Sequence, residues 1–238
     1  MFTFLKTFWK IITYKEWNHY LFAKAFLETV KITFLSSLVS FFLGLSLGVY
    51  LYLLKMKKHH KRYFICNMFI NFLISTPFLL LIVLFIKFFL YPFFGLSYGF
   101  KVGLISLILI LTPLFGRHCE QIFLTVNPEI YQTSYSLGAN NWQFIKFFLL
   151  KETCSDIVLK ASSLFVTSLA YSSVLGIIGH IGIGEIAISR GYNGDSSLLK
   201  LNGFNSLDLI MVCVFSMFAL TQIVQLIGGF LAAKLDKR

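Results

Sequence analysis

Residues 32–54 read ITFLSSLVSFFLGLSLGVYLYLL, a stretch without a charged side chain that lies between Lys31 and Lys55. A helix of these 23 residues can cross the hydrocarbon core of a bilayer, which takes about 20 apolar residues. Two more charge-free windows of similar length follow along the chain, at residues 63–86 and 209–233, and a third apolar window, at residues 157–184, holds Lys160 as its one charged side chain. The sequence therefore contains at least four segments that are typical of membrane-spanning helices.

A shorter apolar window covers residues 102–116. It reaches full length if Lys101 extends its amine towards water and the helix continues beyond Arg117. The whole chain is 57% hydrophobic and only 13% charged, against about 45–50% and about 25% in ordinary globular proteins. Since only helices and closed barrels satisfy the backbone within lipid, we predict an all-α integral membrane protein with five transmembrane helices. Its formal charge of +11 then reflects membrane orientation rather than nucleic-acid binding.

The basic residues divide unevenly between the two sides of the membrane. Twelve of them fall on the side of the C-terminus, in the loop after the first span, in the segment between the third and fourth spans, and in the tail. Only Lys87, Lys101, Arg190 and Lys200 fall on the other side. Because Lys and Arg are enriched on the cytoplasmic side of membrane proteins, we predict a cytoplasmic C-terminus and an N-terminus outside.

The N-terminal segment departs from this pattern. The first 31 residues hold five lysines, which favour the cytoplasmic side, and aromatic side chains alternate with them. Such a mixture is typical of an amphipathic helix that lies in the membrane interface, and a disordered lead is the alternative. We therefore divide the chain into an amphipathic or flexible lead, residues 1–25, and a membrane domain, residues 26–238.

The segment between the third and fourth spans contains two helix signals. Asn127 is a favourable N-cap, Pro128 suits the first helical position, and Glu129 complements the positive end of a helix. This helix should end at Gly138, which can adopt the left-handed conformation, and Asn140 can cap a second helix. The result is a helix–glycine–helix elbow on the cytoplasmic side. It is either a hairpin that covers the bundle or a docking surface for a soluble partner.

The elbow resembles the coupling loop of the permease subunits of bacterial ABC importers. That loop carries Glu-Ala-Ala, a glycine several residues later, and Leu-Pro near its end. Residues 131–152 read YQTSYSLGANNWQFIKFFLLKE, with Gly138 at the position of the glycine. The chain departs from the pattern where Gln132 and Thr133 replace Glu and Ala, and where Lys151 replaces the proline. By this resemblance the ATPase-coupling residues are Gln132, Thr133, Gly138, Ala139, Leu149 and Leu150.

Three more stretches make the chain similar to methionine-import permeases in particular. Residues 170–192, AYSSVLGIIGHIGIGEIAISRGY, are similar to the end of the fourth helix and the glycine-rich turn of that family. Residues 27–34, LETVKITF, and residues 74–78, ISTPF, are similar to it at corresponding positions. The resemblance implies a multi-pass permease of the bacterial inner membrane that moves methionine, without catalytic residues or a cofactor of its own.

The resemblance also implies the partners of the chain. It predicts a homodimer that binds two cytoplasmic ATP-binding subunits through the elbow and receives substrate from an external substrate-binding lipoprotein. The sequence contains no GxxxxGK[ST] phosphate-binding loop, so ATP would be hydrolysed by another chain. One alternative is a permease for another amino acid or small solute. An alternative from a different class is a membrane channel or scaffold that is not coupled to ATP.

The fourth span supplies the candidates for the transport pathway. Small residues run along it, so it can approach a symmetry-related copy closely. Related permeases narrow their pore near the end of this span, which implies a pathway set of Tyr171, Ser172, Val174, Leu175 and Gly176. An apolar gate formed by Val174 and Leu175 is one interpretation, and packing against the fifth span is the other. The glycine-rich turn serves either gating or close packing and helix termination, through Gly179, Gly182 and Gly184.

Other combinations of reactive residues do not indicate a catalytic or metal site. The four cysteines are scattered without a metal-binding spacing, and we expect them to fill apolar space. Ser172, Ser173 and His180 lie close in the sequence, but the nucleophile-elbow motif of a hydrolase is missing. One histidine, His118, lies beside Arg117 and Glu120, which is too few ligands for a metal. We predict an ion network at a helix end there.

Two further features concern the helices themselves. Pro77 and Pro113 lie inside predicted spans, and proline removes a backbone hydrogen bond, so we expect a kink at each. Gln222 and Gln225 lie three residues apart in the fifth span, on one face of that helix. We expect these two amides to join helices rather than to contact substrate.

Overall fold

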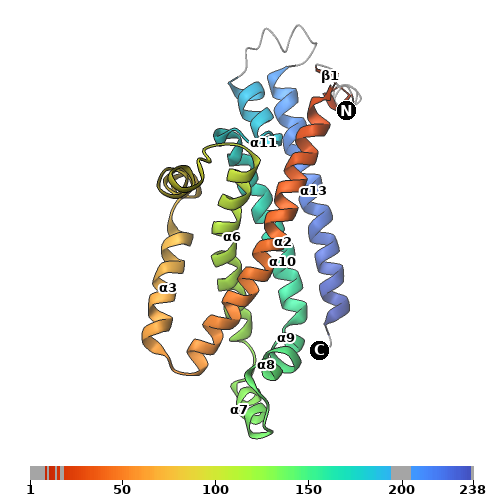
Figure 1. Ribbon diagram of the computed structural model, residues 1–238. Coiled ribbons are helices and arrows are strands. Elements are labelled where there is room, and N and C mark those ends of the chain that lie inside the picture. Colours follow the sequence, from red (N-terminus) through yellow and green to blue (C-terminus); the bar gives the residue numbers. More distant parts are fainter. Residues whose placement is uncertain (1–8, 10, 14, 17–18, 194–204, 237–238) are drawn as a thin grey trace. The chain divides into compact units, whose positions relative to one another are not determined.

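The computed structural model describes every residue of the chain except 1–8, 10, 14, 17–18, 194–204 and 237–238. The described residues are almost entirely helical (Figure 1). They form two compact units. Unit 1 comprises Met1–Ser36, Phe78–Leu107 and Val166–Ile223, and unit 2 comprises Ser37–Pro77, Ile108–Phe165 and Val224–Arg238.

Four helical segments are long and apolar enough to cross a membrane: α2 (Leu21–Met56), α6 (Phe100–Phe123), α10 (Cys154–Ser172) with its 3-10 continuation η3 (Ser173–Ile178), and α13 (Ser206–Leu235). They contain 24 to 36 residues each, more than the roughly 20 that a span requires. A fifth span is present if a bent helix pair counts as one. The predicted all-α membrane fold is therefore confirmed, and the short window at 102–116 extends beyond Arg117 as expected.

The second predicted span, residues 63–86, is not one continuous helix. It divides into α3 (His60–Ser75) and α4 (Phe78–Phe85), separated by Thr76 and Pro77. A proline disfavours the helical conformation of the residue before it, and Thr76 is accordingly extended, with φ −77° and ψ 133°. The Thr76 N–H and hydroxyl both donate to the carbonyl of Phe72, at 3.1 and 2.7 Å. The kink expected at Pro77 is thus a complete break, whereas Pro113 lies inside the uninterrupted α6.

Unit 1 contains several shorter elements besides its parts of the long helices. They are the π-helical η1 (Ile86–Leu90), α5 (Tyr91–Phe94), α11 (Ile183–Glu185), the π-helical η4 (Ile186–Tyr192), and the two-residue strands β1 (Lys15–Glu16) and β2 (His19–Tyr20), which pair antiparallel. The predicted interfacial helix of the lead falls largely on residues 1–8, 10, 14 and 17–18, outside the described residues. Helix α2 already begins at Leu21.

The core of unit 1 joins the start of α2 to the segments near α11 and α13. Phe22, Ile183, Ile186 and Val212 belong to one buried apolar cluster. Farther along α2, the hydroxyls of Ser36 and Ser168 lie 2.9 Å apart and form a hydrogen bond. Hydroxyl pairs of this kind join helices where no water is present. Unit 1 is thus held by apolar packing near α11 and by small polar contacts between α2 and α10.

Unit 2 is packed around close contacts between α2 and α6. A Cβ atom added to Gly48 would lie 2.5 Å from Cys119 Cβ, and one added to Gly116 would lie 2.8 Å from Leu47 Cδ2. A side chain would not fit at either position, and glycine lets the two membrane helices approach closely there. Helix α13 packs on α10 in the same unit, where the Ser155 hydroxyl donates to a carbonyl of α13 at 2.9 Å.

Candidate functional site

The elbow predicted between the third and fourth spans lies within unit 2 and begins with α7 (Pro128–Ser136). The side chain of Asn127 accepts a hydrogen bond from the Glu129 N–H at 2.9 Å, so Asn127 is the N-cap. Pro128 occupies the first helical position. Asn127 gives a partner to one backbone N–H at the helix start, and Pro128 has no N–H that needs one. The predicted start of the helix is confirmed.

The elbow turns at Gly138, whose φ is +81°. Its N–H donates to the Tyr135 carbonyl at 2.9 Å, and the next N–H donates to the Ser134 carbonyl at 3.0 Å. Glycine adopts this left-handed conformation without the strain that a Cβ atom would add. The predicted left-handed turn at Gly138 is therefore confirmed.

The second helix of the elbow starts at α8 (Asn141–Gln143), continues as the π-helical η2 (Phe144–Leu149), and ends with α9 (Leu150–Glu152). The Asn140 N–H donates to the Gln143 side chain at 2.8 Å, which closes the first turn. The Tyr135 hydroxyl donates to Asn141, so a hydrogen bond joins the helices on the two sides of the glycine. Burial is the main cause that raises the pKa of Tyr135, so this donor stays protonated at neutral pH.

Phe144 is the centre of the elbow's packing. Its side chain is fully buried, and its ring lies 5.1 Å from that of Tyr131 on α7 and 6.3 Å from that of Tyr52 on α2. Tyr52 in turn lies 6.0 Å from Phe123 at the end of α6. Aromatic pairs at these distances add to the stabilisation from apolar burial. The elbow is therefore a fixed part of unit 2.

Two large apolar side chains of the elbow are exposed near the glycine turn. Leu137 is 77% exposed and Trp142 is 69% exposed, and a Cβ atom on Gly138 would have no neighbour within 4 Å. Exposed large apolar side chains at one place are typical of a surface that contacts another molecule. Water-exposed Trp is also one of the residues most enriched at the centres of protein interfaces.

A cavity of about 620 Å³ lies on another side of the elbow, between α7, η2 and the ends of α10 and α13. Its lining includes one cation, Lys151, and four carboxylates, Glu129, Glu152, Asp156 and Asp236. Among the described residues of this lining, carboxylates thus outnumber cations. Carboxylates of this kind attract cationic side chains of a partner. The sequence alone does not indicate this cavity, because residues from separate segments of the chain line it.

The predicted coupling residues occupy different environments in the elbow. Gln132, Thr133 and Gly138 are exposed, and Thr133 lines the cavity. Ala139 and Leu150 are half-buried. Leu149 is fully buried, and its carbonyl accepts from the Thr153 hydroxyl at 2.8 Å. The exposed members can contact a partner, whereas Leu149 supports the elbow from inside.

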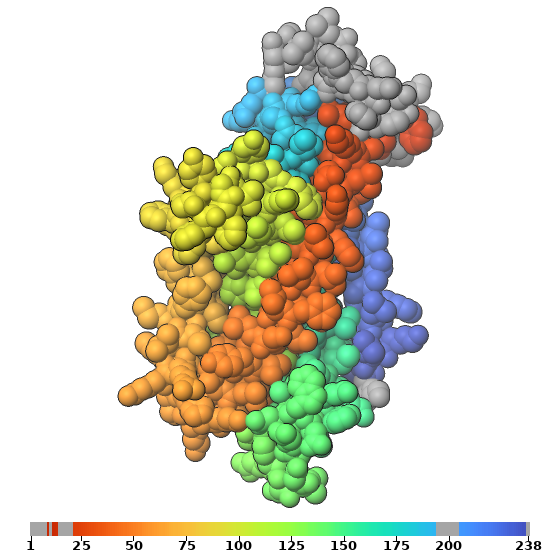
Figure 2. Space-filling view, viewed as in Figure 1, coloured from red at the N-terminus to blue at the C-terminus, as the bar shows by residue number. Residues whose placement is uncertain are grey.

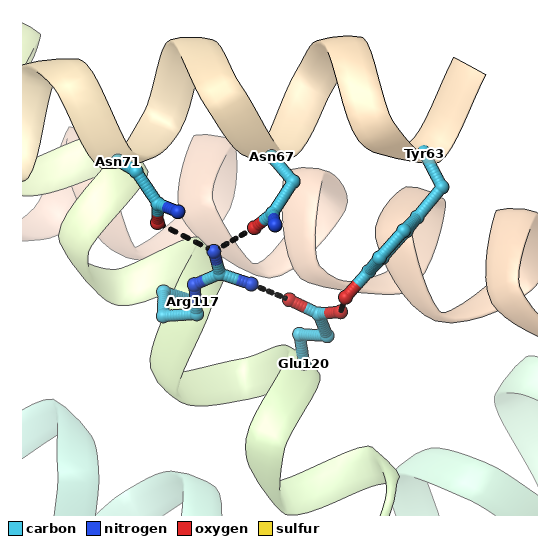
Figure 3. A network of polar contacts seen from close by, with 5 residues as sticks. All are labelled: Tyr63, Asn67, Asn71, Arg117 and Glu120. Carbon is cyan, nitrogen blue, oxygen red and sulfur yellow. Dashed lines mark hydrogen bonds and ion pairs between the residues drawn. The ribbon is translucent and has the colours of Figure 1, made fainter. Parts of the chain in front are cut away.

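A network of polar side chains joins α3 and α6 in unit 2 (Figure 3). Arg117 donates to Glu120 at 2.7 Å, and also to Asn71 at 2.7 Å. It donates to Asn67 as well, and the Tyr63 hydroxyl donates to Glu120 at 2.6 Å. Glu120 is only 1% exposed. Buried charges are tolerated when they are paired and hydrogen-bonded, and this network fulfils both conditions.

The network confirms the ion network predicted from Arg117 and Glu120, although His118 contributes no hydrogen bond to it among the contacts in Figure 3. The partners on α3 were not among the predicted residues. Tyr63, Asn67 and Asn71 follow one another at intervals of four residues, which places them on one face of a helix. That spacing, in an otherwise apolar stretch, is the signal that could have identified them.

The glycine-rich turn of unit 1 is held by close backbone contacts. A Cβ atom on Gly184 would lie 2.2 Å from the Ser173 carbonyl oxygen, so α11 lies directly against η3. Gly179 ends η3 with φ +75°. The predicted end of the fourth span at residue 184 is therefore wrong, since the helix stops before Gly182 and Gly184. The Ile183 N–H donates to the Thr29 hydroxyl at 2.9 Å, which ties the turn to α2.

The predicted pathway residues lie at the junction of α10 and η3. The Tyr171 ring stacks on that of Phe78 at 4.5 Å, and the Ser172 hydroxyl donates to the Leu169 carbonyl at 2.7 Å. Val174 is half-buried. Leu175 is fully buried, and its side chain approaches to 3.0 Å of a Cβ atom placed on Gly103. Leu175 therefore packs inside unit 1, and Val174 is the more accessible of the two gate candidates.

Comparison with curated proteins gives relatives of similar length. The chain is 24% identical over 219 residues to a "probable D-methionine transport system permease protein" of Haemophilus influenzae, which covers 91% of this chain and 98% of the relative. It is 28% identical over 241 residues to the protein of the same description in Vibrio cholerae, which covers 95% and 98%. With the D-methionine transport system permease protein of Yersinia pestis it is 30% identical over 164 residues, covering 66% and 73%.

Comparison with solved structures agrees with the curated relatives. A chain of the MetNI methionine ABC transporter in an inward-facing conformation is 25% identical, with a TM-score of 0.83, covering 91% of this chain and 97% of that one. A chain of an amino acid ABC transporter is 17% identical, with a TM-score of 0.68, covering 90% and 94%, and it shares the fold.

A family profile described as the binding-protein-dependent transport system inner membrane component matches residues 40–238. This match spans most of the membrane domain, including α6, the elbow and the glycine-rich turn. It agrees with the family that the elbow and the stretch 170–192 predicted. This chain belongs to the family of binding-protein-dependent transport system inner membrane components.

Proposed function

We propose that this chain is the membrane permease subunit of an ATP-driven importer of methionine. The observation that carries the proposal is the likeness over nearly the whole chain to D-methionine permeases and to a chain of the MetNI methionine ABC transporter. The sequence contains no phosphate-binding loop of the GxxxxGK[ST] type. ATP is therefore hydrolysed by a separate subunit, and this chain transmits the resulting motion to the transport pathway.

The elbow is the proposed docking site of that ATP-binding subunit. The exposed Leu137 and Trp142 beside Gly138 supply the apolar contact. Glu129 and Asp156 at the neighbouring cavity supply contacts for basic side chains of the partner. Phe144 keeps the elbow fixed to α2 and α6, so that a force applied to the elbow reaches the membrane helices. Two copies of the permease would bind two ATP-binding subunits, with an external substrate-binding protein on the opposite side of the membrane.

The proposed orientation has the N-terminus outside and the elbow in the cytoplasm. It rests on the excess of basic residues at one end of the spans. Cysteine substitutions at His60 and Tyr192, in a chain without native cysteines, test it because both side chains are exposed. A membrane-impermeant maleimide added to intact cells should label position 192 and leave position 60 unlabelled. Labelling of position 60 alone would mean that the chain has the opposite orientation.

Val174 is the proposed apolar gate between two copies of the chain. It is half-buried within its unit, so part of its surface is available to a second copy, whereas Leu175 is buried completely. An apolar constriction excludes water and ions by dewetting. Val174→Asp should therefore make proteoliposomes leak ions. Leu175→Asp is the matched control, because it should prevent folding instead. A well-folded Val174→Asp variant with normal uptake and no leak would remove Val174 from the pathway.

Uptake by proteoliposomes tests the function as a whole. The chain is reconstituted with its ATP-binding subunit and with the substrate-binding protein outside, and uptake of labelled L- and D-methionine is measured with ATP and with a non-hydrolysable analogue. We expect uptake with ATP alone. Competition by excess unlabelled amino acids separates methionine from another cargo. Uptake that is equal with and without ATP, or failure of any ATP-binding subunit to co-purify, would favour a channel or scaffold.

A further inference from the structure

The turn between α2 and α3 concentrates positive charge on unit 2. We call residues 55–62, KMKKHHKR, the basic turn; it holds four lysines, one arginine and two histidines in eight residues. All seven of these side chains are exposed. Within the described residues, none of these five cations forms an ion pair with a carboxylate. The charge of the basic turn is therefore available to an anion outside the chain.

Hydrogen bonds close the backbone of the basic turn, which includes one residue with a positive φ. The His59 N–H donates to the Leu54 carbonyl at 3.0 Å, and the Lys58 N–H donates to the Lys55 carbonyl at 3.1 Å. Lys58 has φ +57°, the positive φ of a non-glycine residue. Glycine adopts this conformation without the strain that a Cβ atom causes. Strained positions of this kind cluster at functional sites, which makes Lys58 a candidate contact of the basic turn.

Helix α3, which follows the basic turn, has two contrasting faces. Its polar face is occupied, because Tyr63, Asn67 and Asn71 belong to the network with Arg117 and Glu120 (Figure 3). Its other face is exposed and apolar, with Phe64, Ile65, Met68, Phe69 and Phe72 each more than 60% exposed. Side chains of α3 project from the surface in Figure 2. In a membrane protein, an exposed apolar face of this length faces acyl chains.

We propose that the basic turn and the exposed face of α3 together bind an anionic phospholipid, such as phosphatidylglycerol or cardiolipin. The cations hold the phosphate headgroup, and the acyl chains lie along Phe64, Met68 and Phe72. Helix α3 also begins without a side-chain cap, and the positive end of its dipole adds to the attraction of the headgroup. A soluble phosphate would use the cations but not the apolar face, and this is why we assign a lipid. The inference requires a membrane location, which the family shows, and it is independent of cargo and orientation.

Native mass spectrometry of the full chain, with the subunits that co-purify, tests the proposal. The protein is released from detergent in the presence of phosphatidylglycerol or phosphatidylcholine, and the retained lipids are counted. Each lysine near an anionic lipid surface contributes about fivefold in affinity, so the triple variant Lys57→Gln, Lys58→Gln and Lys61→Gln should lose most of its preference for phosphatidylglycerol. The matched control removes three exposed lysines from elsewhere in unit 2, namely Lys146, Lys151 and Lys234, and should keep that preference.

Two further measurements make the result decisive. Lys58→Asn removes one cation while its residue still accepts a positive φ, so a drop of about fivefold in this variant is due to charge and not to misfolding. Inorganic phosphate at millimolar concentration should not displace the lipid. The proposal would be wrong if the turn variants retained phosphatidylglycerol as the wild type does, if the control variant lost it equally, or if phosphate alone displaced it. None of these readings depends on whether the chain transports methionine.

Discussion

Glu120→Gln tests the network that joins α3 to α6. The carboxylate accepts from Tyr63 at 2.6 Å and from Arg117 at 2.7 Å, and it is 1% exposed. Removing one partner of a fully buried ion pair costs about 3–5 kcal/mol, whereas one hydrogen bond between membrane helices contributes about 0.6 kcal/mol on average. The Arg117 side chain is 19% exposed and keeps its amide acceptors. Because water and the amides partly replace the lost carboxylate, we expect a loss of about 2 kcal/mol.

Reversible unfolding by dodecyl sulfate in mixed micelles measures this loss as a free energy of unfolding. The single variants Glu120→Gln and Arg117→Gln and the double variant complete a double-mutant cycle. Since the two side chains form one ion pair, the coupling free energy should be about 1–2 kcal/mol. Tyr63→Phe is the matched control: it removes one hydrogen bond and leaves the ion pair, so it should cost only about 0.6 kcal/mol.

Two results would refute this reasoning. If the Glu120 and Arg117 effects were additive to within about 0.5 kcal/mol, the two charges would not stabilise each other. If Glu120→Gln cost no more than Tyr63→Phe, the carboxylate would act only as a neutral acceptor. In either case the position of α3 would be fixed by apolar packing, and the network would be a consequence of that packing.

The remaining predictions concern three other places in the fold. Gly138→Val should add about 1–2 kcal/mol of backbone strain and reduce co-purification of the ATP-binding subunit, while Gly138→Asn, which tolerates a positive φ, should retain it. Gly184→Ala should lower the free energy of unfolding by about 1–3 kcal/mol, because its Cβ atom would lie 2.2 Å from a backbone oxygen; Gly229→Ala, with no neighbour within 4 Å, should be neutral or stabilising in a melting experiment. Burial lowers the pKa of His180, so as the pH falls the imidazole of the unfolded chain is protonated before that of the folded chain. The free energy of unfolding should therefore decrease as the pH drops below about 6.5, by no more than about 1.4 kcal/mol per pH unit. His180→Phe should remove this slope in melting curves recorded from pH 7.5 to pH 5.

The positions of the long helices were predictable because the membrane imposes a simple rule on composition. The windows at 32–54 and 209–233 fall inside α2 and α13. The ends of the helices were less predictable, since α2 begins at Leu21 and so includes Glu28 and Lys31. Charged residues mark where the hydrocarbon ends, but a helix continues until its backbone hydrogen bonds are interrupted. The charge-free window 32–54 therefore underestimates the length of α2.

Two prolines in similar settings had different outcomes, and the sequence around them does not explain the difference. Pro77 separates α3 from α4, whereas Pro113 is buried within a continuous α6. After the break, Phe78 stacks on Tyr171, almost a hundred positions away in the chain, at 4.5 Å. A contact of this kind can favour a break that local sequence only permits. Proline indicates where a helix is weak, and distant packing decides whether it divides.

The polar network shows the same limit for the candidate sites. Arg117 and Glu120 lie three residues apart, so their ion pair could be predicted within one helix. Tyr63, Asn67 and Asn71 also share a helix face, but their spacing does not say which helix this face meets. A stripe of polar side chains in an apolar helix needs partners, because lipid offers none, and an ion pair inside another span needs hydrogen bonds for the same reason. The polar stripe on α3 therefore requires polar partners, and the ion pair on α6 requires hydrogen bonds. Together the two patterns support pairing α3 with α6, and neither supports it alone.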